Sequence, residues 1–440
     1  MPNAITATNS PRAHGAPRVL TVLPDFPYPA TTGLHLRHLS NLKLLHRLGI
    51  YSAVLYFTTE ERDPPPLEAT LLGTICDEVR HGGPRFPHAN FSTASLVSYK
   101  LDFLFRGALG IPGKRYPFSM SYDRVGAEQI ILAEAGRVRA DFVVLASMFM
   151  HYTRTLRRAG FEVIIDAADV LTDLSASFMA TLSGRAGKLG LYANHVACRS
   201  QERIFLREVS EVWTTSAAEA TRFSSIAPGA RVIVVPNSLD EKTIRPAPDP
   251  QHPVVGFIGT YSYTPNLHAA LFLADEVFPR VLRECPAAVL RLAGANMPQA
   301  DAARLQKLAR VEVLGRVEDS GCFMDECAVV ALPVFLRGGV PLKLVEAMAR
   351  AKAVVASPEI VAGLEIVDGR EALIRSGAED FAGAIVALLR DQSRRAQLGA
   401  NARTRFVQDF SLSSVEKSLR SGSRLVQQAK TSDRKDVVLR

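Results

Sequence analysis

Aromatic side chains and cysteines are scarce in this chain of 440 residues, of which aromatics make up only 7%. Its five cysteines are scattered along the sequence, and no pair of His or Cys residues accompanies Cys322 and Cys327. A disulfide framework needs an even set of closely spaced cysteines, and a structural zinc site needs four ligands at characteristic spacings. We therefore expect reduced thiols and a fold that depends on its hydrophobic core.

Long apolar runs are also missing. No stretch approaches the roughly 18 apolar residues that a membrane-spanning helix needs. Residues 1–16 lack the apolar centre of a signal peptide, so we expect a disordered tail there. A second polar tail is expected at 431–440. Together with the reduced thiols, these features predict a cytoplasmic protein.

The charge balance is positive, with a formal net charge of +8. A basic surface favours anionic partners such as nucleotides or phospholipid headgroups, although solvated surface charge accounts for much of it. The sequence contains no zinc finger, RNA-binding sheet motif or basic-region helix, so nucleic acid is not an expected partner.

Short apolar runs alternate with amphipathic segments through most of the chain. The runs show little two-residue alternation, which is typical of strands that are buried on both faces. Alternating strands and helices predict parallel sheets covered by helices on both sides, an α/β fold. The predicted strands are 18–23, 52–58, 141–146, 161–166, 211–215, 254–259, 288–293, 311–314, 329–334 and 353–357. The predicted helices include 36–48, 199–208 and 268–283.

A proline-rich break separates two series of these elements. Prolines 246, 248, 250 and 253 follow turn residues at 236–238, which indicates an inter-domain linker at 241–253. We therefore predict two doubly wound, Rossmann-like domains, at 17–240 and 254–410, with a ligand site in the cleft between them. A final helix at 411–430 is expected to cross back.

Residues 81–117 form an insertion in the first series, in which aromatic and basic side chains alternate. Its aromatic residues are Phe86, Phe91, Tyr99, Phe103, Phe105 and Tyr116, and its basic residues include Lys100, Arg106, Lys114 and Arg115. This mixture suits a surface that contacts a membrane interface, but it also suits a helical subdomain packed on the sheet.

The segment 337–350 has the pattern of an anion site. Gly338 and Gly339 remove side-chain bulk and precede Pro341 and a run of strong helix formers. The N-terminus of such a helix attracts an anion through its free N–H groups and its dipole. Lys343 adds a positive charge, and Glu346 lies one turn further on. A nucleotide fits this pattern, with its diphosphate at the helix start and its ribose on the acid; a buried helix with a surface Lys–Glu pair fits it too.

Several motifs, in order, resemble the retaining, nucleotide-sugar-dependent glycosyltransferases of the GT-B fold, in particular family 4 (glycosyl transferases group 1) and its bacterial exopolysaccharide subgroup. The resemblance covers about residues 18–413. The motifs are 23–29 with Gly33 and Arg37, 234–240 at the domain junction, 256–266, 313–319, and 338–349 with Gly363 and Leu364.

The resemblance implies two domains facing across a cleft, with the acceptor bound on the first domain and the nucleotide sugar on the second. It implies catalytic roles for Lys343 and Asp169. Lys343 and the following residues are implied to bind the donor: Gly33, Arg37, Gly259, Thr260, Asn266, Arg316, Arg337, Gly338, Gly339, Val340, Leu342 and Glu346. Several of these have simpler interpretations: Gly33 as a turn residue, Arg37 and Arg316 as surface arginines, and Asn266 and Asp169 as helix caps.

The chain departs from the family pattern at three places. Gly338 stands where the family carries the first of two glutamates, which leaves the identity of the sugar open. Thr260 and Asn266 stand where an arginine and a lysine commonly clamp the diphosphate. Ala168 replaces a histidine on the acceptor side, while Asp169 is retained.

We therefore expect a hexosyltransferase that moves a sugar from a nucleoside diphosphate to a hydroxyl of a glycan, lipid-linked saccharide or small molecule. No metal or other cofactor is expected, because the sequence lacks an Asp-x-Asp pair. Two alternatives remain: a non-catalytic scaffold that binds nucleotide sugars, and a nucleotide-sugar 2-epimerase. A peripheral contact with the inner face of the plasma membrane through 81–117 is expected of a lipid-acceptor enzyme.

Overall fold

The computed structural model describes residues 5–6, 16–30, 32–58, 70–84, 101, 104–107, 109–111, 126–168, 170, 172, 185–335 and 340–427. The chain forms two compact units. Unit 1 comprises Met1–Val235 and Glu416–Arg440, and unit 2 comprises Pro236–Val415.

Unit 1 is built on a sheet of eight strands in the order β1-β4-β3-β2-β5-β6-β7-β8. All neighbours pair in parallel except β1, which is antiparallel to β4. The strands are β1 (Ile5–Thr6), β2 (Arg18–Leu23), β3 (Tyr51–Thr58), β4 (Glu78–Pro84), β5 (Phe142–Ala146), β6 (Glu162–Ala167), β7 (Glu211–Thr214) and β8 (Arg231–Val234). Strand β1 lies inside the stretch that we predicted to be a disordered tail, because its backbone adds to the edge of the sheet beside β4.

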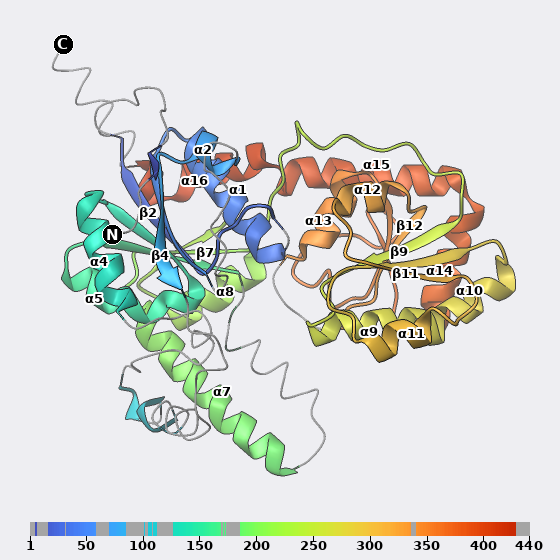
Figure 1. The fold of residues 1–440 in the computed structure, drawn as a ribbon, viewed down its shortest axis with the longest axis horizontal. Helices are drawn as coiled ribbons and strands as arrows, with labels where there is room; N and C mark the ends of the chain where they lie inside the picture. The colour runs from blue at the N-terminus through green and yellow to red at the C-terminus, as the bar shows by residue number, and fades with distance from the viewer. Residues whose placement is uncertain are drawn as a thin grey trace. The chain divides into compact units, whose positions relative to one another are not determined.

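Helices cover both faces of this sheet, α1, α2 and α16 on one and α4, α5 and α8 on the other (Figure 1). The central strands β2, β3, β5, β6 and β7 are almost wholly buried, which explains their apolar, non-alternating sequences. Among the described residues, the helices of unit 1 are α1 (Gly33–Arg47), α2 (Leu72–Ile75), α4 (Ala127–Arg137), the 3₁₀ segment η4 (Ser147–Tyr152), α5 (Thr153–Arg158), α7 (Arg185–Leu206) and α8 (Ala217–Ile226). Helix α16 (Leu412–Gly422) begins in unit 2 and ends in unit 1.

Unit 2 contains a wholly parallel sheet of six strands in the order β11-β10-β9-β12-β13-β14. Its strands are β9 (Val254–Ile258), β10 (Val289–Ala293), β11 (Val311–Gly315), β12 (Val329–Leu332), β13 (Ala353–Ala356) and β14 (Leu373–Ile374). Its helices are α9 (Thr264–Phe272), the π-helical turn η5 (Leu273–Val277), α10 (Phe278–Glu284), α11 (Gln299–Leu305), α12 (Ser320–Asp325), α13 (Leu342–Ala349), α14 (Ala378–Arg390) and α15 (Gln392–Asp409). Helices α12, α13 and α15 lie on one face of the sheet, and α9, α10 and α11 lie on the other (Figure 1).

The stretch predicted as a linker, 241–253, lies within unit 2, as do the residues just before it. Leu239 pairs with the backbone on both sides of Ser411. The N–H group of Leu239 donates to the carbonyl of Phe410 (3.1 Å), and the N–H group of Leu412 donates to the carbonyl of Leu239 (3.0 Å). Further along, Asp249 forms an ion pair of 2.5 Å with Arg395 on α15. The boundary between the units therefore falls after Val235, before the prolines.

Candidate functional site

The two halves of the unit 2 sheet diverge at β9. The chain runs from β9 outward through β10 and β11, and then returns to the other side of β9 with β12. In open parallel sheets, ligands bind outside the carboxyl ends of the strands at such a switch point. Residues 259–266 leave β9 here, and α13 begins at Leu342, after β12 has ended at Leu332. Both segments carry residues that we predicted to bind the donor.

Lys343 extends from α13 to the end of β9. Its Nζ donates a hydrogen bond of 2.7 Å to Oδ1 of Asn266 and lies 4.6 Å from the centre of the Phe257 ring. Among the described residues, no carboxylate pairs with this ammonium group. An amide and an aromatic ring hold this cation but do not neutralise its charge, so an anion can still pair with it.

Burial lowers the pKa of Lys343 from its ordinary value of 10.5 to about 7. Removing an ammonium from water disfavours its charged form unless a counter-charge is provided. An anion that binds beside Lys343 provides that counter-charge, so the site favours a negatively charged ligand.

Asn266 was weighed as a helix cap and as a phosphate contact; the structure shows no cap, and the phosphate contact stays a prediction. Its Nδ2 donates to the carbonyl of Thr260 (3.0 Å) while its Oδ1 accepts from Lys343. The amide is therefore engaged on both sides, and it fixes the lysine relative to the loop after β9. No side-chain hydrogen bond from Asn266 caps α9.

Two glycines make this packing possible. A Cβ on Gly259 would lie 2.8 Å from Cγ of Asn266 and 3.0 Å from Nζ of Lys343. Gly294, which follows β10 with a φ of +136°, lies so close to the Gly259 carbonyl that a Cβ would come within 1.8 Å of the oxygen. The end of β10 thus meets the end of β9, and the end of β9 meets Lys343, at positions without a side chain.

Glu346 faces a different neighbour. Its two carboxylate oxygens lie 2.8 and 3.0 Å from Oγ of Ser320, the first residue of α12. Nε of Arg350 lies 3.7 Å from Oε1. Burial raises the pKa of this carboxyl group, and the hydrogen bond from Ser320 and the charge of Arg350 oppose the rise. Glu346, which we predicted to lie one turn inside an anion site, is thus largely buried, and its carboxylate accepts a hydrogen bond from the Ser320 hydroxyl group.

The start of α13 differs slightly from the prediction. Pro341 is the N-cap residue, and its carbonyl accepts from the N–H groups of Leu344 and Val345. The carbonyl of Val340 accepts from Nδ2 of Asn237 (2.5 Å). Leu342 is buried. Within the described part of the chain, the N–H groups of Leu342 and Lys343 have no hydrogen-bond partner, as expected at a helix start.

The other predicted donor-binding residues of unit 2 are less constrained. Thr260 contributes its carbonyl to Asn266, and Arg316 is exposed just after β11. Arg337, Gly338 and Gly339 lie outside the described residues, as does Asp169, the predicted catalytic acid of unit 1.

In unit 1, Gly33 is the exposed first residue of α1, behind the N-cap Thr32. Arg37, one turn later, is 2% exposed. Its Nε donates to Asp166 (2.9 Å), its Nη2 forms an ion pair of 2.5 Å with the same carboxylate, and its Nη1 donates to the Val235 carbonyl (3.0 Å). We expected a surface arginine or a donor contact; the structure instead has a buried ion pair, which would have to open before Arg37 could reach a donor.

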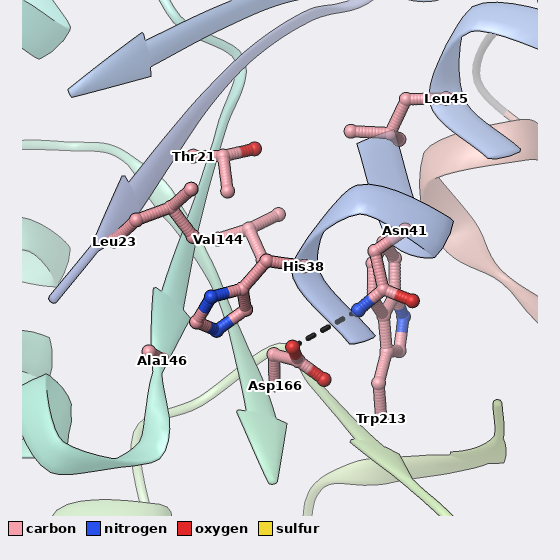
Figure 2. A pocket seen from close by; sticks show the side chains of 9 residues that line it. All are labelled: Thr21, Leu23, His38, Asn41, Leu45, Val144, Ala146, Asp166 and Trp213. Atoms are coloured by element: carbon pink, nitrogen blue, oxygen red, sulfur yellow. Dashed lines mark hydrogen bonds between the residues drawn. The ribbon is translucent and has the colours of Figure 1, made fainter. Parts of the chain in front are cut away.

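A small cavity lies beside this ion pair, at the switch point between β2 and β5 of unit 1 (Figure 2). Four of its lining side chains are polar: Thr21, His38, Asn41 and Asp166. Asn41 donates to Asp166 (2.9 Å), whereas Thr21 Oγ1 and both ring nitrogens of His38 have no hydrogen-bond partner among the described residues. Burial, helped by the charges of Arg37 and His35, lowers the pKa of His38 to about 3, so its imidazole is neutral.

Sequence reasoning missed Ser320, Asp166 and Gly294. Ser320 follows an Asp in a loop that we had singled out, but nothing local connects it to Glu346. Gly294 directly follows a predicted strand, which is the one signal that could have identified it.

Two negative observations apply to the described residues. They include no group of three or more His, Cys, Asp or Glu side chains placed to hold a metal ion. They also include no helix that is long and apolar enough to cross a bilayer.

Residues 252–391 match the sequence model of the family described as glycosyl transferases group 1. This segment contains Gly259, Asn266, Ser320, Lys343 and Glu346. No curated protein gives a significant match to the chain.

Solved structures share the fold. Sucrose-phosphate synthase from Thermosynechococcus elongatus is 15% identical, with a TM-score of 0.65 over 94% of this chain and 100% of that one. HepE from Anabaena in complex with UDP is 17% identical, with a TM-score of 0.60 over 92% and 98% of the two chains. The HepE complex with UDP-glucose gives 16% and 0.59, over 94% and 98%.

At these identities the likeness concerns the fold: two parallel-sheet α/β domains of the GT-B type, as predicted. The family match and the fold together support a group 1 glycosyltransferase.

Proposed function

We propose that this protein transfers a sugar from a nucleoside diphosphate to a hydroxyl acceptor, with retention of anomeric configuration. The observation that carries the proposal is Lys343, a partly desolvated cation without a carboxylate partner among the described residues, at the switch point of unit 2. The diphosphate is its counter-charge. The first-turn N–H groups of α13 add to the same field.

Glu346 is the proposed ribose ligand. It lies one turn from Lys343 on α13, and its carboxylate has acceptor capacity beyond the Ser320 hydroxyl. Hydrogen bonds from two ribose hydroxyls to this acid would be charge-assisted. HepE, a protein of the same fold, has been crystallised with UDP and with UDP-glucose, which makes UDP-glucose the first donor to test.

The reaction requires stabilisation of the leaving group. As the bond between the anomeric carbon and the phosphate oxygen breaks, the diphosphate gains negative charge and the sugar becomes oxocarbenium-like. Lys343 and the N–H groups at the start of α13 stabilise that negative charge, and they are already in place before the reaction. The acceptor oxygen bonds to the same face of the anomeric carbon, and its proton passes to the departing phosphate oxygen. No step in this scheme uses a metal ion.

The acceptor is proposed to bind unit 1, where Asp169 would orient its hydroxyl group. Gly33, at the start of α1, is proposed to let the backbone approach the diphosphate from unit 1. Arg316, Arg337, Gly338 and Gly339 stay in the proposed donor site on the strength of the resemblance. A glycan, a lipid-linked saccharide or a small molecule would each provide the hydroxyl group.

A peripheral membrane contact is proposed for the insertion at 81–117. Of its residues, Leu101, Phe105, Leu109 and Ile111 are large, apolar and exposed. Side chains of this kind bind at the headgroup level of a bilayer, helped there by basic neighbours. The contact predicts co-flotation with vesicles that contain phosphatidylglycerol, lost in a Phe105→Ser/Leu109→Ser variant; equal flotation of the two proteins would rule it out.

The donor site is tested by replacing Glu346 with alanine. We expect the Michaelis constant for the nucleotide sugar to rise at least about tenfold, because a hydrogen bond to a charged group contributes about 1.5–3 kcal/mol. Glu379→Ala, which removes an exposed acid from the first turn of α14 in the same unit, is the matched control and should leave the constant unchanged. Unchanged donor affinity in Glu346→Ala would refute the ribose role.

The two alternatives give different products. A non-catalytic scaffold binds the nucleotide sugar and releases nothing, whereas a transferase hydrolyses it slowly when no acceptor is present. An epimerase yields the 2-epimer of the donor sugar. Release of free sugar and nucleoside diphosphate, followed by chromatography, therefore separates the three functions.

A further inference from the structure

The carboxylate of Glu346 is held from two sides. Ser320 Oγ lies 2.8 and 3.0 Å from its two oxygens, and Nε of Arg350 lies 3.7 Å from Oε1. These contacts come from different elements: Arg350 lies at the C-terminal end of α13 itself, and Ser320 opens α12. The side chain of Glu346 is only 14% exposed, so these neighbours determine where the acid points.

The position of Ser320 is itself fixed by the start of α12. Asp319 is the N-cap, and its Oδ1 accepts from the N–H groups of Gly321 (2.6 Å) and Cys322 (3.2 Å). The next residue, Gly321, lies against the Arg350 guanidinium: a Cβ there would come within 1.5 Å of Nη2, so the arginine side chain would have to shift. Arg350 is anchored beyond this point by an ion pair of 2.7 Å with Asp325.

The hydrogen-bonding capacity of the carboxylate leaves room for a ligand. An ionised carboxylate has about four lone-pair sites, and a serine hydroxyl has one proton to donate. Ser320 therefore occupies one site, on whichever oxygen the hydroxyl faces. Two neighbouring hydroxyl groups of a ligand still find acceptors on the same acid.

We propose that Ser320 is a positioning residue that orients Glu346 to accept both hydroxyls of a ribose, and so makes the site selective for ribonucleotides. This inference rests on the proposed function, because it takes Glu346 as the ribose ligand. Ser320 acts through Glu346 and contacts no reacting atom.

The placement of Ser320 also joins two parts of the donor site. The loop from Arg316 to Asp319 resembles the segment beside the nucleobase, and Ser320 follows it directly. A shift of this loop would carry the serine hydroxyl with it and turn the acid away from the ribose. Base and ribose recognition are therefore coupled through one hydroxyl group.

The experiment compares ribose and deoxyribose ligands. Calorimetry measures the binding of UDP, GDP and ADP, and of the 2′,3′-dideoxy counterpart of the tightest, to the wild type and to Ser320→Ala, Ser320→Thr and Ser376→Ala. Alanine is a good helix former at the first position of α12, so the variant should fold. Ser376, exposed before α14, is the matched control.

We expect Ser320→Ala to weaken ribonucleotide binding by about tenfold to a hundredfold, the range for loss of a hydrogen bond to a charged group. Binding of the dideoxy ligand should change less than about twofold, and Ser320→Thr should restore most of the loss. In turnover, Ser320→Ala should raise the donor Michaelis constant and leave kcat nearly unchanged.

Each result has one meaning. An equal loss for both ligands, or no loss for either, overturns the positioning role of Ser320 while the proposed function stands. Failure of the wild type to bind any of the three nucleoside diphosphates overturns the proposed function, and the role of Ser320 falls with it.

Discussion

Loss of contact with water shifts the pKa of two residues in the proposed donor site. Lys343 loses water without gaining a carboxylate, and its pKa falls to about 7. Glu346 loses water too, and the pKa of its carboxyl group rises. Arg37 and Asp166 are buried more deeply, but they pair with each other, and the ion pair leaves neither charge for a ligand. Among these groups, the lysine is the one whose charge depends on what binds beside it.

Donor affinity should therefore depend on pH through Lys343. Below pH 7 the free lysine is charged and meets the diphosphate directly. Above pH 7 it is neutral, and binding must first take up a proton, which weakens affinity by up to about tenfold for each further pH unit. Titration calorimetry with UDP-glucose, whose diphosphate does not titrate in this range, measures the effect between pH 6 and 9.

Lys343→Met provides the comparison for that titration. The variant should bind UDP-glucose more weakly at pH 6 and show no slope above pH 7, and its turnover should fall by about tenfold to a thousandfold, as when one transition-state donor is lost. A slope that survives in Lys343→Met would mean that another group titrates.

At the scale of elements, the site depends on how closely two strand ends approach each other. Gly294 after β10 lies against the carbonyl of Gly259 after β9, and Gly259 in turn lies against Asn266 and Lys343. Any side chain at either position would separate the strand ends or displace the lysine. The glycines therefore connect the register of the sheet to the geometry of the anion site.

Gly294→Ala should destabilise unit 2. Its φ of +136° is unfavourable for alanine, and the new Cβ would meet a carbonyl oxygen at 1.8 Å. We expect a loss of about 1–3 kcal/mol or more in the free energy of unfolding, measured by chemical denaturation. Gly383→Ala, inside α14 with no atom within 4 Å of the new Cβ, is the matched control and should be neutral or slightly stabilising. Similar stability of the two variants would show that the strand ends separate readily.

At the scale of the whole molecule, each unit has a hydrophobic core of its own. One core gathers apolar residues of β9–β13 and their helices, and the other gathers those of β2, β3 and β5–β7. The proposed donor site around Lys343 lies within unit 2, and the cavity beside Arg37 lies within unit 1. A ligand should therefore stabilise one unit more than the other against local unfolding.

Hydrogen exchange should locate the nucleotide. With a nucleoside diphosphate at a hundred times its dissociation constant, which stabilises the binding unit by about 2.7 kcal/mol, we expect slower exchange at 259–266, 316–320 and 340–346. Any effect at Gly33 should be smaller, because unit 1 is proposed to contribute a backbone contact alone. Glu346→Ala should lose the protection. Protection confined to unit 1 would contradict the proposed donor site.

The sequence by itself determined the order of the elements and the class of the fold. Parallel strands that are buried on both faces have short apolar sequences. In amphipathic helices, apolar residues recur every three or four positions, so both kinds of element can be recognised from a short stretch of sequence. The pairing of a cation with an acid one turn later, at Lys343 and Glu346, is local as well. The prediction was less reliable at edges: β1 lies within the expected disordered tail, and the expected inter-domain linker lies inside unit 2.

Only the tertiary structure decided which side chains meet. Asn266 and Lys343 are separated by 77 residues, Ser320 and Glu346 by 26, and Arg37 and Asp166 by 129. Such contacts depend on the order of strands in the sheet and on close packing at their ends, and no local pattern in the chain encodes either. For that reason the sequence could name Lys343, Glu346, Asn266 and Gly259, whereas the contacts between them and the parts played by Ser320 and Gly294 emerged from the fold.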